Sequence, residues 1–155
     1  MSMNKFLSWI LVVLFMVVIF YLSHQPAIES DQLSTGITEI IIKTIEKVVP
    51  NADFDIGSFN HIIRKNAHFF AYLVLGVLVI NAMRRSGVSG YRSVGIALVI
   101  CALYAVSDEV HQLFIIGRSG ELRDVLIDSA GASAGVGVYC LIDRVVRCKK
   151  ENDSV

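Results

Sequence analysis

Two acidic residues, Asp108 and Glu109, stand side by side within an otherwise apolar segment of residues 94–116. An ionisable side chain at bilayer depth costs roughly 2.5 to 3.5 kcal/mol, so such residues usually face a bundle interior or a water-filled cavity. His111 and Gln112 lie in the same segment. The segment therefore predicts a helix that carries a polar site into a packed helical bundle.

The composition indicates a membrane protein. Hydrophobic residues make up 54% of the 155 residues, which exceeds the apolar share of soluble proteins, and 14 basic residues balance 14 acidic ones. Without net charge, nothing points to a nucleic-acid partner. Four segments are long enough to cross about 30 Å of hydrocarbon as helices. They are residues 6–22, 67–83, 94–116 and 124–142.

We therefore expect a single all-α domain over residues 1–155, an integral membrane bundle of four transmembrane helices. The first apolar segment also resembles the apolar part of a signal peptide, but the weak cleavage site that follows favours a retained helix. Residues 23–66 form a long polar connection in which apolar residues recur at helical spacing over 33–48. This spacing predicts an amphipathic helix that lies on the membrane surface or packs over the mouth of the bundle.

Small residues in the fourth segment predict a close helix contact. Gly131 and Gly135 form a GxxxG step, which lets a neighbouring backbone approach. The three cysteines, Cys101, Cys140 and Cys148, have no motif spacing, and we expect them to be reduced.

Charge counting predicts the orientation. Lys5 lies near the N-terminus, three arginines lie in the loop of residues 84–92, and further basic residues follow residue 143. This pattern places both termini and the loop on the cytoplasmic side of the membrane. The outer ends of the second, third and fourth helices then meet in one layer. That layer brings together polar residues from three remote segments: Arg64, Lys65, His68 and Tyr72; Asp108, Glu109, His111 and Gln112; and Arg118, Asp124 and Asp128.

At these residues the sequence resembles the VanZ-like family of bacterial membrane proteins. The matching pieces are SHQP at 23–26, RKNAHFFAYLVLG at 64–76, YAVSDEVHQLFIIGR at 104–118 and DVLIDSAGASAG at 124–135. The resemblance implies a small multi-pass protein of the cell envelope, in a family named for a member associated with low-level resistance to the glycopeptide teicoplanin. Two positions depart from the family pattern, which more often has Asn at Asp128 and Glu at Ala71.

The residues favour a pocket for an anionic ligand. Arginine presents a planar fork and lysine a mobile charge to phosphate or carboxylate. We expect ligand contacts from Arg64, Lys65, Tyr72, Gln112, Arg118 and Asp128, and acid or base groups from His68, Asp108, Glu109, His111 and Asp124. The expected ligand is a membrane lipid or lipid-linked cell-wall precursor, either bound only or also chemically modified. The sequence assigns no cofactor and no protein partner.

Two other functions compete with this hypothesis. A transporter or proton relay would need polar groups through the full membrane depth, whereas the inner halves of the second and third helices are apolar. A structural or partner-binding protein would use the charges only to hold the bundle together. A mixed metal site of His68, Glu109, His111 and Asp124 is conceivable, but no ligand spacing supports it, and we predict no metal.

Overall fold

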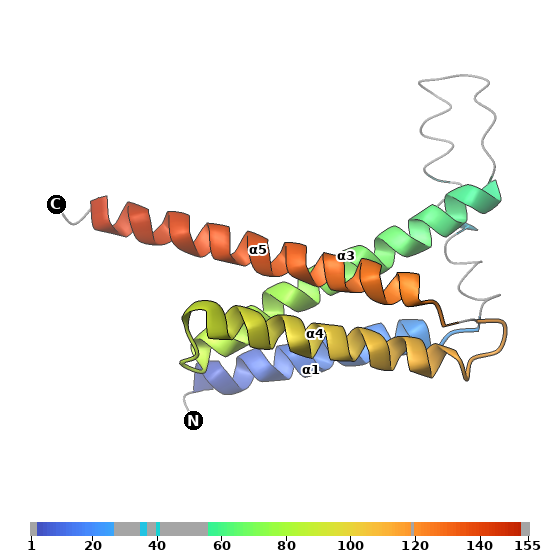
Figure 1. The fold of residues 1–155 in the computed structure, drawn as a ribbon, viewed down its shortest axis with the longest axis horizontal. Coiled ribbons are helices and arrows are strands. Elements are labelled where there is room, and N and C mark those ends of the chain that lie inside the picture. Colours follow the sequence, from blue (N-terminus) through green and yellow to red (C-terminus); the bar gives the residue numbers. More distant parts are fainter. Residues whose placement is uncertain (1–2, 27–34, 37–39, 41–55, 119, 153–155) are drawn as a thin grey trace, which may run out of the picture.

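A computed structural model describes residues 3–26, 35–36, 40, 56–118 and 120–152 of the chain. Within these residues the protein contains four long helices and no strand (Figure 1). The helices are α1 (Met3–Ser23), α3 (Ile56–Arg85), α4 (Gly90–Gln112) and α5 (Leu122–Asn152). Each contains a stretch long and apolar enough to cross a membrane. The predicted all-α bundle with four membrane-spanning helices is confirmed.

The four described helices alternate in direction along the chain. Helices α1 and α4 run in one direction and α3 and α5 in the other, so the start of α1, the end of α5 and the turn at residues 86–89 lie at one end of the bundle (Figure 1). Helix α3 packs against the other three and most extensively against α5. The opposite end gathers the end of α1, the end of α4 and the start of α5. We call it the site end.

Glycines bring α3 and α5 into backbone contact. A Cβ added to Gly131 would collide with the carbonyl oxygen of Phe69, and one added to Gly135 would collide with that of Leu73. Gly76 of α3 meets the backbone of α5 in the same way. The close contact predicted from the GxxxG step is confirmed.

Apolar side chains lie both inside and outside the bundle. The core between the helices includes Leu75, Val79 and Cys101, which are fully buried. The outer faces are also apolar, as at Leu103 on α4 and Leu141 on α5, which are both exposed. Such an outer surface suits hydrocarbon rather than water. The three cysteines are free, as expected.

Two hydrogen bonds fasten α1 to the bundle, one in its first half and one in its second half. The Tyr104 hydroxyl donates to the Met16 carbonyl oxygen at 2.6 Å, and the Trp9 indole N–H donates to the Ser86 hydroxyl at 3.0 Å. Because bonds of this kind satisfy polar groups that hydrocarbon cannot, α1 is an integral part of the packed bundle.

The helix ends differ from the predicted boundaries. Helix α4 ends at Gln112, four residues before the predicted end, because the N–H groups of Phe114 and Ile115 bond three residues back and so tighten the chain into turns. Helix α5 continues ten residues past residue 142, where Asp143 and Arg147 form an ion pair one turn apart at 2.9 Å. The amphipathic helix predicted over residues 33–48 lies almost entirely outside the described residues and stays a prediction.

Candidate functional site

The site end is built around the last turns of α4 and a tight return to α5. Asp108 and Gln112 are four residues apart and so share one face of α4, and both are buried. After the helix, Gly117 has φ 78°, a left-handed conformation that glycine adopts at little cost. This turn sends the chain back toward the bundle, where α5 begins at Leu122.

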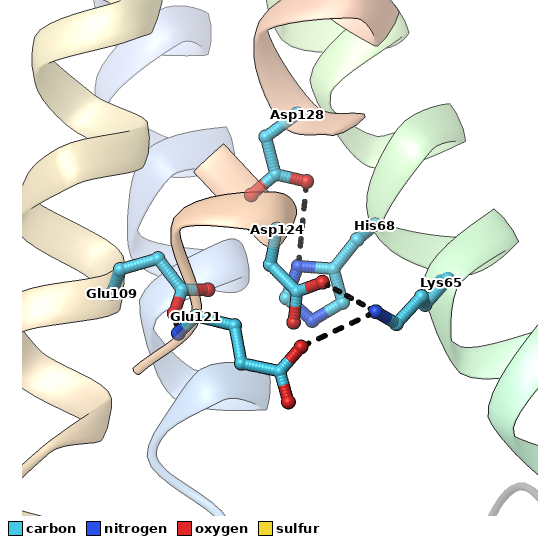
Figure 2. A network of polar contacts seen from close by, with 6 residues as sticks. All are labelled: Lys65, His68, Glu109, Glu121, Asp124 and Asp128. Atoms are coloured by element: carbon cyan, nitrogen blue, oxygen red, sulfur yellow. Dashed lines mark hydrogen bonds and ion pairs between the residues drawn. The ribbon is translucent and has the colours of Figure 1, made fainter. Parts of the chain in front are cut away.

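Glu109 holds the connection between α4 and α5 in place through a hydrogen bond. Its Oε2 accepts a hydrogen bond from the backbone N–H of Glu121 at 2.8 Å (Figure 2). The bond joins the end of α4 to the residue just before α5. Glu109 is buried and does not line the pocket described below. Its hydrogen bond is to the backbone of the connection between α4 and α5.

Lysine and aspartate join α3 to the start of α5. Lys65 Nζ lies 3.0 Å from Asp124 Oδ1 and 3.5 Å from Glu121 Oε2 (Figure 2). The two acids also stand at the N-terminal end of α5, where the helix dipole favours negative charge. This pairing holds two helices whose sequence positions are about 60 residues apart.

A second pair lies one turn deeper. His68 Nδ1 is 3.6 Å from Asp128 Oδ1, and Asp128 is fully buried (Figure 2). Because α3 and α5 run in the same direction, the step from Lys65 to His68 matches the step from Asp124 to Asp128.

Asp108 and His111 face α1. The Ser23 hydroxyl donates to Asp108 Oδ2 at 2.8 Å, and His24 Nδ1 lies 3.1 Å from His111 Nε2. The His111 ring also stacks on Phe20 at a centroid distance of 4.3 Å. His111 therefore contacts α1, whereas His68 contacts Asp128 of α5.

His68, Asp108 and Asp128 form a compact cluster, which we call the triad. Their ligand atoms all lie within 4.8 Å of one another. The other members of the metal set considered from the sequence have different surroundings: Glu109 holds the return, His111 contacts α1 and Asp124 pairs with Lys65. Tyr72 is fully buried one turn beyond His68.

A pocket of about 70 Å³ opens beside the triad. Its charged lining consists of three bases, Arg64, Lys65 and Arg118, and three acids, Glu121, Asp124 and Asp128. The rest of the lining is His68, Gln112, Gly117 and Ile127. Seven predicted site residues therefore share one pocket wall, whereas Tyr72, Asp108, Glu109 and His111 lie outside it.

Two contributors were not predicted as site residues. Ser23 orients Asp108, and Glu121 contacts both Lys65 and Glu109. Ser23 belongs to the SHQP piece of the family resemblance, which was the available signal. Glu121 follows the glycine-containing turn, where nothing in the residue pattern marks a partner.

Comparison with known proteins gives the family. No curated protein and no solved structure matches the chain significantly. The family model described as VanZ/LLP1 matches residues 7–143, which include all four membrane-spanning stretches in large part and the whole site end. This membrane protein, whose described residues include four helices apolar enough to span a membrane, belongs to the VanZ/LLP1 family.

Proposed function

We propose that this protein lies in the bacterial cytoplasmic membrane with both termini in the cytoplasm. At its outward site end it would bind the anionic head group of a membrane lipid or a lipid-linked cell-wall precursor. The orientation is supported by basic residues at the opposite end, among them Lys5, Arg85 and Arg147. The bundle end that carries them also holds the start of α1, the end of α5 and the turn at residues 86–89 (Figure 1).

The observation that carries the proposal is a polar pocket bordered by exposed apolar residues. Arg64, Lys65 and Arg118 line the pocket. Ile116 and Leu122 are each next in sequence to a lining residue. Their side chains are 86% and 78% exposed. An amphipathic ligand with a phosphate head and a hydrocarbon tail matches both parts of this surface.

The three bases have two different roles in the proposal. Arg118 and Arg64 would contact phosphate oxygens through their forked N–H groups. Lys65 would add a third positive charge while it holds α5 through Asp124. Asp124 lines the same pocket and is the acid or base group to which we assign chemical modification of the head group, the second part of the hypothesis.

Charge placement argues against a transporter. Among the described residues, the buried acidic side chains are Asp108, Glu109 and Asp128, all at the site end. The middle of the bundle is filled by residues such as Leu75 and Ile80. A continuous polar path through the membrane is therefore not part of the described core.

Lipid binding tests the proposal directly. Purified protein in detergent would be titrated with a polyprenyl phosphate and with the uncharged polyprenol of the same length, and complexes counted by native mass spectrometry. We expect a clear preference for the phosphate. Arg118→Gln should weaken phosphate binding about tenfold or more, because a hydrogen bond to a charged group contributes about 1.5–3 kcal/mol.

Arg123→Gln is the matched control, because Arg123 is an exposed arginine at the same end that does not line the pocket. Equal binding of the phosphate and the alcohol would refute the proposal. So would an equal effect of the two arginine substitutions, since general loss of positive charge would then explain the change.

A double substitution separates function from architecture in cells. Lys65→Met with Asp124→Leu replaces an observed ion pair by apolar residues, which is often tolerated by the fold, whereas removal of one partner is not. We expect the double variant to be present in the membrane as folded protein in wild-type amounts. It should no longer produce the change in teicoplanin susceptibility that the wild-type protein produces. A folded and fully active double variant would show that the pair serves the fold alone.

A further inference from the structure

The triad carries more buried oxygen atoms without a hydrogen bond than a folded protein ordinarily keeps. Asp108 is 2% exposed and Asp128 is 0% exposed. Asp108 Oδ1 and both carboxylate oxygens of Asp128 make no hydrogen bond within the part of the chain that the structure describes. Burial of such groups is costly unless hydrogen bonds, opposite charge or a metal compensates for lost hydration.

The distances within the triad match metal ligands better than hydrogen-bond partners. The 3.6 Å between His68 Nδ1 and Asp128 Oδ1 exceeds the usual hydrogen-bond range of about 2.7–3.2 Å. Two ligands of one tetrahedral metal, each about 2.0–2.2 Å from it, are separated by about 3.3–3.6 Å. All three ligand atoms lie within 4.8 Å of one another, so a small movement of the side chains toward a common centre would complete the set.

The residues around the triad orient one of its carboxylates and leave the triad open to the pocket on one side. Ser23 binds Asp108 Oδ2 and leaves Oδ1 for a further partner, as an outer hydrogen-bond donor does for a metal-bound carboxylate. Gln112 lines the adjoining pocket, is 5% exposed, and its Nε2 has no hydrogen-bond partner among the described residues. His68 and Asp128 line that pocket too, so a fourth ligand such as water could enter from it.

We propose that His68, Asp108 and Asp128 bind one divalent transition-metal ion, of the kind for which Zn²⁺ and Mn²⁺ are representative. One imidazole and two carboxylates suit these ions, whereas sites for Mg²⁺ and Ca²⁺ are built from oxygen alone. Three protein ligands beside a pocket are the arrangement that leaves a coordination position open. The two positive charges of the ion would neutralise the two buried carboxylates.

The proposal stands apart from lipid binding, because its test uses metal alone. Full-length protein purified in detergent would be treated with a chelator, dialysed and titrated separately with Zn²⁺, Mn²⁺, Mg²⁺ and Ca²⁺. Bound metal would be quantified by elemental mass spectrometry and affinity by calorimetry. We expect one equivalent of Zn²⁺ or Mn²⁺ with at least tenfold preference over Mg²⁺ and Ca²⁺, and a rise in melting temperature on metal addition.

Substitutions identify the ligands. Asp128→Asn and His68→Gln should each weaken metal binding at least a hundredfold, whereas Asp143→Asn, an acidic residue at the other end of α5, should not change it. Ser23→Ala keeps all three ligands and should weaken binding about tenfold to a hundredfold through loss of orientation. This variant tests the site even where a ligand substitution prevents folding.

Three results would overturn the proposal. The first is no stoichiometric binding of either transition metal by the folded wild-type protein. The second is unchanged affinity in both Ser23→Ala and Asp128→Asn. The third is loss of binding in His111→Ala with retention in His68→Gln, which would move the site to the histidine pair of α1 and α4. Since none of these measurements contains lipid, they leave the head-group proposal to its own test.

Discussion

Two glycines of α5, two residues apart, give opposite predictions for the same substitution. Gly135 meets the Leu73 carbonyl oxygen of α3, whereas nothing lies within 4 Å of a Cβ built on Gly137. Both are in the interior of one helix, so Gly→Ala changes the intrinsic helix preference equally at the two positions. Any difference between the variants therefore measures the helix contact.

The magnitudes follow from that comparison. Alanine in a helix interior is preferred over glycine by roughly 0.5–1 kcal/mol, so Gly137→Ala should stabilise the protein by about that amount. At Gly135 the added methyl group meets a backbone oxygen that cannot rotate away, and overpacking costs typically about 1–3 kcal/mol. Taking the upper value for a rigid obstacle, Gly135→Ala should lose about 2 kcal/mol net. The two variants should differ by about 3 kcal/mol.

Thermal unfolding in one detergent provides the assay. For a chain of this size, 3 kcal/mol corresponds to roughly 6–12 °C between the melting temperatures of the two variants. Gly131→Ala should behave like Gly135→Ala, because it faces the Phe69 carbonyl oxygen. Equal melting temperatures for Gly135→Ala and Gly137→Ala would refute the close α3–α5 contact.

Three further predictions concern orientation and local structure. In intact cells, a cysteine introduced at Ile116 should react with a membrane-impermeant maleimide, whereas native Cys148 should react only after permeabilisation. The two side chains are exposed and lie at opposite ends of the bundle. The reverse labelling pattern would show that the proposed orientation is inverted. Tyr104→Phe should lower the free energy of unfolding by about 0.5–1.5 kcal/mol through loss of the bond to Met16, measured by thermal unfolding, and no loss would contradict that bond. Gly117→Ala should cost about 1–2 kcal/mol in the same assay because φ is 78°; an increase in stability would show that the turn is not left-handed.

Much of the fold can be predicted from the sequence because hydrocarbon restricts the choices. A chain segment that crosses it must satisfy its own backbone hydrogen bonds, so long apolar segments become helices. Alternation of those helices then places Lys65 and Asp124 at one end although they are far apart in sequence, and they lie 3.0 Å apart. The GxxxG step likewise predicts a close contact, since only small residues permit it.

Helix boundaries are less predictable from composition. Leu113 to Ile116 are apolar enough to extend α4, yet the helix ends at Gln112 and these residues form turns. The turn places the Glu121 N–H against Glu109, and that long-range hydrogen bond cannot be read from an apolar pattern.

The choice of partner inside the site depended on tertiary structure. Helical periodicity predicts that Asp108 and Gln112 share a face of α4, but not which neighbouring helix that face meets. Ser23 of α1 binds Asp108, and His111 contacts His24 rather than His68. A side chain a few ångströms long reaches one neighbour or another according to the rotation and crossing angle of its helix. Those are set by packing along the whole helix length, which residue spacing within a single segment does not encode.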